Sequence, residues 1–275
     1  MTNIVPISAV IFTKNEENNI CECINSLQQF AEVVVVDSMS MDKTQDYARK
    51  LGAKVVEFNW NGQYPKKRQW SLENINFSHP WILFVDADER VSPELAIEIK
   101  NFLQMNPNNF KAGSIPIEYF FAGKKLKYGQ KPRKIALLHI QSSKFPIIDD
   151  LNVEGMGELE GHYQPRIQGK VRKFKSKIVH DDVDPISSWM IRHVRYANWE
   201  AHLLLNKSVK VDVESSKGLI ASIFHKFPFR PLNFFFYSYF FKLGFLDGRA
   251  GFDYAIAKSW YYWLSEVIAT EKVVK

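Results

Sequence analysis

The sequence is poor in cysteine, in repeats and in long apolar runs. Among its 275 residues the only cysteines are Cys21 and Cys23. A spacing of one residue inside a predicted helix suits neither a disulfide nor a zinc site, so we interpret both as structural thiols in a reducing compartment. The chain enters a predicted strand within a few residues, without a leader, which indicates a cytoplasmic protein. No apolar span of about twenty residues occurs, and this argues against a transmembrane helix.

Charge of neither sign dominates, but basic residues are in excess. The chain has 36 Lys and Arg residues against 30 Asp and Glu residues, a net charge of +6 at pH 7. Such a charge suits nucleic acid, anionic lipid or a phosphorylated substrate, and it does not choose among them. Basic residues are dense in Lys124–Lys134 and Lys170–Lys177, so a nucleic-acid-binding module is one hypothesis.

The first ninety residues alternate between short apolar runs and amphipathic segments. Strands are expected at Ile7–Phe12, Val33–Val36, Lys54–Phe58 and Trp81–Val85, with helices at 19–30 and 44–51 between them. This order predicts a Rossmann-like, mostly parallel α/β sheet flanked by helices. After a helix near Ser92–Met105 the pattern breaks into shorter pieces, for which we expect mixed strands, and a long helix is predicted from Pro185 to Leu205.

Polar segments follow three of the predicted strands, where ligands bind in open α/β sheets. They are Thr13–Glu17, Asp37-Ser38 and Asp86-Ala87-Asp88. In an extended segment, residues two apart point the same way, so Asp86 and Asp88 can share a divalent cation that bridges a diphosphate. The alternative is an acidic turn before the helix that begins near Ser92. The loop after the first strand has no glycine, which argues against a nucleotidyltransferase with a glycine-rich phosphate loop.

The order and spacing of these motifs resemble those of the inverting family 2 glycosyltransferases of the GT-A fold, particularly bacterial enzymes of lipopolysaccharide-core and surface-glycan synthesis. The resemblance is carried by TKNEENNI at 13–20, VVDSMSMDKT at 35–44, LFVDADE at 83–89 and KLGFLDGRAGF at 242–252. It implies a UDP-sugar donor, a glycan or lipid-linked acceptor, no nucleic acid, and Mg²⁺ or Mn²⁺ as cofactor. A nucleotidyltransferase and a non-catalytic protein that binds nucleotide sugars or nucleic acid are the alternatives.

The resemblance also implies roles for individual residues at the strand ends. Asp37 would accept a hydrogen bond from uracil, and Asp88 would bind the metal with His180 completing its coordination. The remaining nucleotide-binding candidates are Thr13, Glu16, Lys67, Arg68, Asp86 and Ala87. For Lys67 and Arg68, together with Lys66, a solvated basic turn before a helix is an equally good interpretation.

Inverting transfer needs one carboxylate to take a proton from the acceptor hydroxyl. The glycine-rich acidic loop at 153–162 supplies three candidates, Glu154, Glu158 and Glu160. Similar enzymes often have a His-Glu pair here, where this chain has Gly157-Glu158. We predict Glu158 as the base, ahead of Glu160.

The last sixty residues are dense in aromatic side chains, with Lys and Arg between them. We therefore divide the chain into a catalytic domain at 1–215 and a helical extension at 216–275. Aromatic faces flanked by cations suit helices that lie in a membrane interface, with Phe245, Leu246 and Phe252 entering the lipid. The protein would then be peripheral at the inner face of the cytoplasmic membrane. A helical core or a homo-oligomer surface is the alternative.

Overall fold

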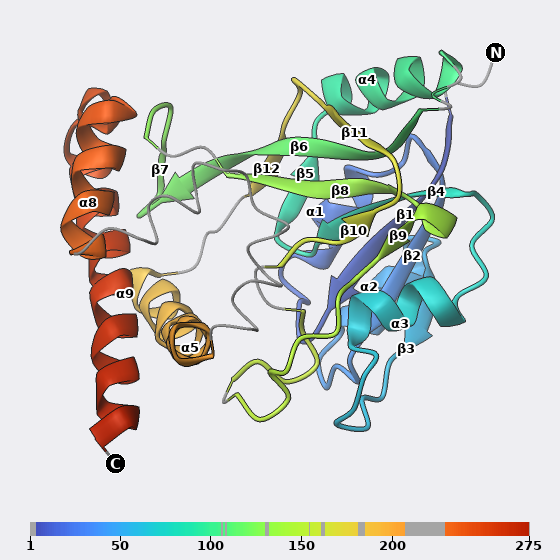
Figure 1. Ribbon diagram of the computed structural model, residues 1–275. Helices are drawn as coiled ribbons and strands as arrows, with labels where there is room; N and C mark the ends of the chain where they lie inside the picture. Colours follow the sequence, from blue (N-terminus) through green and yellow to red (C-terminus); the bar gives the residue numbers. More distant parts are fainter. Residues whose placement is uncertain are drawn as a thin grey trace.

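The computed structural model describes residues 4–105, 107, 109–129, 132–153, 155–160, 163–180, 185–206 and 229–274 (Figure 1). Two sequence predictions, the candidate base Glu154 and the domain boundary at 215, lie outside the described residues.

A parallel sheet forms the first half of the chain, in the order β3-β2-β1-β4. Its strands are β1 (Val5–Thr13), β2 (Phe30–Asp37), β3 (Lys54–Glu57) and β4 (Trp81–Asp86), and the helices between them are α1 (Ile20–Asn25), α2 (Thr44–Lys50) and α3 (Lys67–Asn74). Successive side chains of β1 enter opposite cores, because Ala9 and Ile11 belong to one apolar cluster while Val10 and Phe12 belong to the other. Burial on both faces explains why these strands read as continuous apolar runs.

The sheet continues beyond β4 with strands of mixed direction, in the order β8-β6-β12-β5. These are β5 (Glu89–Val91), β6 (Phe110–Phe121), β8 (Arg133–His139) and β12 (Ile178–His180), with β7 (Lys124–Lys125) and β11 (Lys170–Lys173) also paired to β6. Helix α4 (Pro93–Gln104), the 3₁₀ turn Ile140–Ser142 and the pair β9 (Ser143–Lys144) and β10 (Arg166–Ile167) complete this part. The predicted α/β class, with mixed strands after the first ninety residues, is confirmed.

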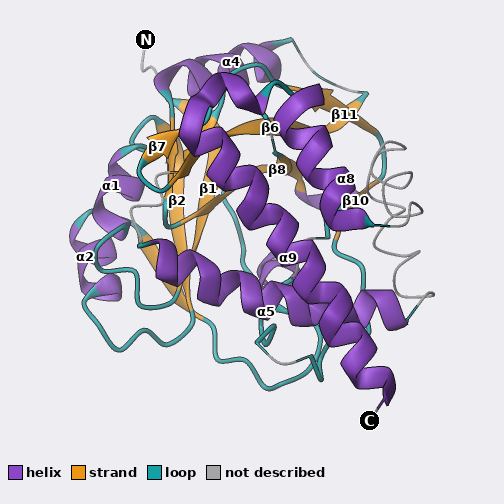
Figure 2. Ribbon diagram, turned by 90° about the vertical axis from the view of Figure 1, so that its left-hand side faces the viewer, coloured by secondary structure: helices purple, strands orange, loops and turns teal. Residues whose placement is uncertain are grey.

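The C-terminal part is helical and aromatic-rich, as predicted. It comprises α5 (Ile186–Leu205), α8 (Arg230–Phe236), a π-helical turn at Tyr237–Phe241, a 3₁₀ turn at Gly244–Asp247, and α9 (Gly248–Val274). Figure 2 shows α9 lying across α5. A buried ion pair between Arg230 and Glu200, 2.6 Å apart, joins α8 to α5. No helix among the described residues is long and apolar enough to span a bilayer.

The junction before α9 depends on a close backbone approach. A Cβ atom added to Gly251 would lie 1.9 Å from the carbonyl oxygen of Gly244, so only glycine fits there. Phe252 packs its ring 6.0 Å from Phe235 and 5.7 Å from Tyr239, and it is only partly exposed. This ring therefore helps to hold α9 against the preceding turns, and its contact with lipid stays a prediction.

Candidate active site

Three strand ends meet at one edge of the sheet. In the parallel register, Thr13 at the end of β1 pairs with Asp37 at the end of β2, and Phe12 pairs with Asp86 at the end of β4. The polar segments that were picked out from the sequence therefore lie side by side at the carboxyl edge, the usual ligand position in such sheets.

Asp37 is buried at this edge and is saturated with hydrogen bonds. Its carboxylate accepts from the Thr13 hydroxyl at 2.7 Å, the Gln45 side-chain amide at 2.7 Å, and both the backbone N–H and the hydroxyl of Ser40, at 2.8 and 2.5 Å. Burial alone would raise the pKa of Asp37, but these hydrogen bonds outweigh it and lower the pKa. All four acceptor positions are used, so a uracil that bonds to Asp37 must displace one of these donors.

The loop after β1 is tied to the loop after β2. Asn15 donates its backbone N–H to the Ser40 hydroxyl at 2.7 Å, and Glu16 donates its own to the Thr44 hydroxyl at 2.8 Å. One carboxylate oxygen of Glu16 accepts from the Asn19 side chain at 2.9 Å. These bonds fix the backbone of the predicted nucleotide pocket, with Glu16 turned toward its own loop.

The basic run at the start of α3 is largely buried, so the interpretation as a solvated turn is wrong. Lys66 and Lys67 are 1% and 2% exposed. Lys66 pairs with the buried Asp150 at 2.8 Å, and Lys67 donates to the Thr13 carbonyl at 2.7 Å and lies 3.8 Å from Glu158. Desolvation lowers the pKa of Lys67 to about 8 despite the nearby carboxylate. Lys67 thus lies at the strand-end edge beside Thr13, whereas Lys66 pairs with Asp150 in the core.

Asp86 forms ion pairs with two cationic side chains. It accepts from Arg68 at 3.0 Å and from Lys134 at 3.3 Å, and Lys134 also bonds to the buried Glu89. Burial raises the pKa of Asp86, but the charges of Lys134 and Arg68 outweigh it and hold the pKa well below its usual range. Lys134 was not identified as a site residue from the sequence, because the sequence shows it only as one of several basic residues in the segment Lys124–Lys134.

Asp88 has a different partner from Asp86, and a cation shared by the two stays a prediction. Strand β4 ends at Asp86, and Ala87 and Asp88 form a turn, so the regular alternation of an extended strand does not continue to Asp88. Asp88 instead lies 3.2 Å from His180 Nε2. The antiparallel pairing of β5 with β12, which sets His180 opposite Glu89, brings them together.

The donor set of Asp88 and His180 fits a divalent cation. A carboxylate oxygen and an imidazole nitrogen about 3 Å apart can occupy adjacent positions around one ion, because ligands of an octahedral ion lie about 2.1 Å from its centre. Their side chains are 34% and 22% exposed, so a ligand can reach both. Within the described residues no three His, Cys, Asp or Glu side chains gather to hold a metal alone, so further ligands would come from the substrate or from water.

The two candidate bases lie in different surroundings. Glu160 is buried, and its carboxylate accepts the backbone N–H groups of Arg68 and Gln69 at 3.0 and 2.9 Å, so it caps the first turn of α3. Burial raises the pKa of Glu160. Glu158 accepts a hydrogen bond from the Ser38 hydroxyl and lies beside Lys67, at the end of β2. Geometry therefore favours a structural role for Glu160.

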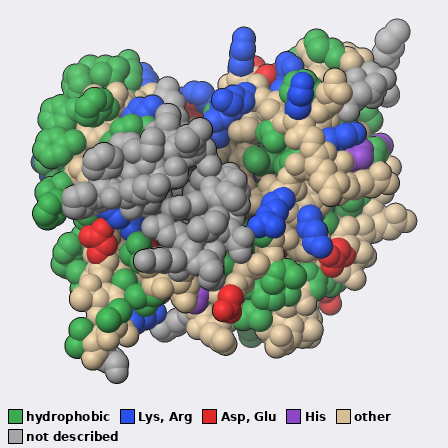
Figure 3. Space-filling view, viewed as in Figure 1, with side chains coloured by type: hydrophobic (Ala, Val, Ile, Leu, Met, Phe, Trp, Pro, Cys, Tyr) green, Lys and Arg blue, Asp and Glu red, His purple; other side chains and the backbone are tan. Residues whose placement is uncertain are grey.

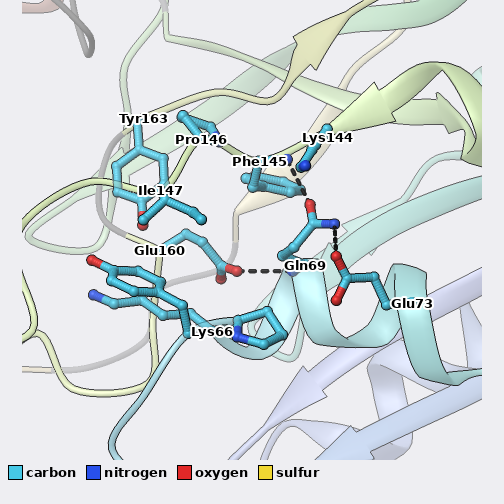
Figure 4. Close-up of a pocket in the computed structure, with 11 residues that line it drawn as sticks. Lys66, Gln69, Glu73, Lys144, Phe145, Pro146, Ile147, Glu160 and Tyr163 are labelled. Carbon is cyan, nitrogen blue, oxygen red and sulfur yellow. Dashed lines mark hydrogen bonds between the residues drawn. The ribbon is translucent and has the colours of Figure 1, made fainter.

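A separate cavity of about 160 Å³ lies behind Glu160 (Figure 4). Its lining comprises Tyr64, Pro65, Lys66, Gln69, Glu73, Lys144, Phe145, Pro146, Ile147, Glu160 and Tyr163. Gln69 donates to Glu73 at 2.7 Å and accepts from the backbone of Phe145 at 2.7 Å, so α3 is fastened to β9 across the cavity. None of the acidic residues at the strand ends lines it.

Helix α5 packs against strand β6 through aromatic side chains. The Trp189 indole donates to the Tyr119 hydroxyl at 2.7 Å and stacks on His193, so Trp189 belongs to the helix core. Burial raises the pKa of Tyr196, although the charges of Arg192 and Arg195 oppose this effect.

The fold brings parts of both basic segments considered for nucleic acid to strand β6, where several of their cations are already paired. Lys125 and Lys177 both pair with Glu118, at 2.6 and 3.2 Å. Arg133 donates to the backbone carbonyls of Ser114 and Phe174, and Lys134 enters the acidic site. These pairings leave fewer cations for a continuous phosphate-binding stripe than the sequence suggested.

We expect replacement of Lys66 by Met to lower the free energy of unfolding by about 3–5 kcal/mol, because the partner Asp150 would be left buried without a cation. Equilibrium urea unfolding measures this change. The exposed Lys173→Met is the matched control, and we expect it to stay within about 0.5 kcal/mol of the native chain. Adding Asp150→Asn to Lys66→Met should restore part of the loss. Equal stability of Lys66→Met and Lys173→Met would contradict a buried ion pair.

The sequence was compared with protein families and with individual proteins. The model of glycosyl transferase family 2 matches residues 8–148. A Rickettsia bellii protein named as an uncharacterized glycosyltransferase is 44% identical over 113 residues, which are 40% of this chain and 37% of that protein. The lipopolysaccharide core biosynthesis glycosyltransferase LpsC of Rhizobium meliloti is 36% identical over 96 residues, 33% of this chain and 34% of LpsC. The chain thus spans well under half the length of these curated relatives.

Solved structures resemble the chain more weakly. Residues 1–349 of TarS from S. aureus match 97% of this chain and 92% of that chain, with 16% identity and a TM-score of 0.42. Glucosyl-3-phosphoglycerate synthase from Mycobacterium tuberculosis, solved with Mn²⁺, UDP and glucosyl-3-phosphoglycerate, matches 41% of this chain and 44% of that chain, with 24% identity and a TM-score of 0.34. Scores of this size do not by themselves establish a shared fold.

Proposed function

The chain belongs to glycosyl transferase family 2, and from this premise we propose that it is an inverting, metal-dependent enzyme that transfers a sugar from a UDP-sugar to a glycan or lipid-linked acceptor. The observation that carries the proposal is the strand-end edge, where Thr13, Asp37 and Asp86 meet beside the Asp88–His180 pair. Family membership also disfavours a nucleotidyltransferase.

The nucleotide would lie along the ends of β1 and β2. Asp37 fixes the loop that contains Ser40, so the polar groups around it are ordered before a ligand arrives. Lys67 and Arg68 bring two cations to the same edge, held by Thr13 and Asp86. An anionic diphosphate beside Lys67 would favour its charged form and would gain from a cation that is already desolvated.

Asp88 and His180 would hold the divalent cation, Mg²⁺ or Mn²⁺. When bound, such an ion offsets the charge that develops on the leaving UDP. Asp86 would act differently, because Arg68 and Lys134 already balance its charge. We therefore propose Asp86 as a residue that positions these two cations, with the metal assigned to Asp88 and His180.

Glu158 is the proposed base, because both carboxylate oxygens of Glu160 accept backbone N–H groups. As the acceptor hydroxyl attacks the anomeric carbon from the face opposite the phosphate, its proton would pass to Glu158. A new glycosidic bond forms, the bond to UDP breaks, and the anomeric configuration inverts.

We also propose that the acceptor belongs to bacterial envelope polysaccharide or lipopolysaccharide synthesis at the inner face of the cytoplasmic membrane. The similarity to LpsC over about a third of each chain supports this assignment. The 242–252 segment, which carried part of the resemblance, forms the junction of the C-terminal helices beside the catalytic sheet.

The proposed donor predicts a specific pattern of thermal stabilisation. UDP and one UDP-sugar should raise the unfolding temperature in Mn²⁺, because a ligand at about one hundred times its Kd stabilises the native state by about 2.7 kcal/mol. GDP, CDP and the corresponding nucleotide sugars are the control ligands for selectivity toward UDP. The shift should shrink when Mn²⁺ is replaced by EDTA. Absence of a shift with every nucleotide would contradict the proposed function, and a shift with GDP alone would change the donor.

A further inference from the structure

The C-terminal segment exposes a continuous set of large apolar side chains. Eight described side chains between 229 and 246 are at least 43% exposed, and we call them the apolar face: Phe229, Leu232, Phe236, Phe240, Phe241, Leu243, Phe245 and Leu246. Figure 3 shows hydrophobic side chains gathered at the upper left, where Figure 1 places α8. A cluster of this kind on one segment indicates an interaction surface rather than scattered exposed residues.

The apolar face is the outer side of a segment whose inner side is already packed. Leu232, Phe236 and Phe240 are four residues apart, so they share one side of the helix, and all three are exposed. On the other side, Phe234 and Ser238 are buried. The segment is thus held to the protein by one side while the rings of the other side face outward.

Four exposed cations lie on or close to the segment that carries the apolar face. Lys242 is on the segment, Arg249 follows it at the start of α9, and Lys124 and Lys127 are on the adjacent hairpin. The hairpin is fastened to the segment, because the Asp247 carboxylate accepts the backbone N–H of Lys127 at 3.0 Å and the backbone carbonyl of Lys242 accepts that of Gly129 at 2.8 Å. The rings and the cations therefore form one fixed surface.

We propose that the apolar face and these four cations bind the surface of an anionic bilayer. Aromatic and aliphatic side chains enter the boundary between headgroups and acyl chains, and Lys and Arg meet the lipid phosphates. A second copy is a poorer partner, because a symmetric contact would bring like cation clusters together. The nearby carboxylates Asp247 and Asp253, the latter bonded to Arg249, offset only two of the four cations, so each copy keeps a net positive charge at this surface.

Membrane contact would fix the orientation of the catalytic edge. Tyr254 of α9 packs 5.6 Å from Tyr119 of β6, and the Tyr119 ring lies 5.7 Å from His180. A rigid connection therefore runs from the apolar face to the proposed metal ligands. The purpose of this contact, which rests on the proposed function, would be to present a lipid-linked acceptor to the site.

Flotation of the full chain with vesicles tests the proposal without any nucleotide sugar. We expect binding to vesicles of phosphatidylglycerol and phosphatidylcholine and much weaker binding to phosphatidylcholine alone. Changing Phe229, Phe241 and Leu246 together to Ser should lower the partition coefficient at least about tenfold, because these three are more than half exposed and each would bury apolar area in lipid. Lys124→Gln, Lys127→Gln and Lys242→Gln together should lower it by a similar factor, mainly with anionic vesicles.

The matched control places the same kind of change on Ile97 of α4 and on Met105, which follows this helix; they are 55% and 71% exposed. Ile97→Ser with Met105→Ser should float like the native chain. Equal flotation of the Phe229, Phe241 and Leu246 variant and the native chain would overturn the proposal. So would a native dimer that does not float and that this variant converts to a monomer, since the face would then bind a second copy. Because the vesicles contain no nucleotide sugar, a failure of this proposal can be distinguished from a failure of the proposed function, which thermal stabilisation by nucleotides tests.

Discussion

Replacement of Asp88 by Ala is expected to lower kcat by about a thousandfold or more. The residue lies 3.2 Å from His180, and the two are the exposed donors proposed to hold the cation. A metal ion contributes several kcal/mol to stabilising charge in such transition states, and each 1.36 kcal/mol is a factor of ten in rate. Steady-state transfer measured with the donor found by thermal stabilisation gives the rate.

Binding measurements separate a metal role for Asp88 from a general disturbance. UDP affinity in Mn²⁺ should fall at least about tenfold in Asp88→Ala, while UDP affinity in EDTA should stay near that of the native chain. Asp46→Ala, which removes an exposed carboxylate from α2, should change neither quantity. Turnover at the native rate in Asp88→Ala would remove this residue from the mechanism. An equal loss of affinity with and without Mn²⁺ would assign it a purely structural role.

The strand-end edge could be predicted because its causes are local. Apolar runs such as Val33–Val36 are short enough for strands, and burial on both faces keeps them continuous. Parallel pairing then brings the residue after each run to the same edge, which placed Thr13, Asp37 and Asp86 together. No knowledge of distant contacts was needed for this step.

The directions of the charged side chains could not be predicted in the same way. Lys134 reaches Asp86 because β8 runs antiparallel beside β4, and that pairing depends on the fold of the whole second half. Lys66 is buried because Asp150 comes from a distant loop. A lysine is solvated or buried according to whether such a partner exists, and the sequence near Lys66 carries no sign of it.

The acidic turn shows how a local rule fails at a strand end. Alternation in an extended chain would put Asp86 and Asp88 on one side, but β4 ends at Asp86 and the chain turns. One carboxylate then meets Arg68 and Lys134, and the other meets His180. The two carboxylates thus have different partners, and this difference is the basis for proposing Asp88 as the metal ligand and Asp86 as a positioning residue.

Replacement of Glu158 by Gln is expected to lower kcat by roughly 10²–10⁴-fold, the usual range for a positioned base. Gln keeps the shape of Glu158 and can still accept a hydrogen bond from Ser38, but it cannot take the acceptor proton. UDP affinity should therefore stay near that of the native chain. Transfer rates and UDP titrations on the same preparation measure both quantities.

Because of the surroundings of Glu158, kcat and UDP affinity must both be measured to decide whether this residue acts as the base or holds the donor. Its contacts with Ser38 and Lys67 lie on the nucleotide side, so a role in holding the donor is the competing explanation. In that case Glu158→Gln would weaken UDP binding and change kcat little, and another carboxylate would have to act as base. Glu160→Gln is the matched control from the same loop. Because Glu160 caps α3, its replacement should lower stability rather than kcat for the folded enzyme.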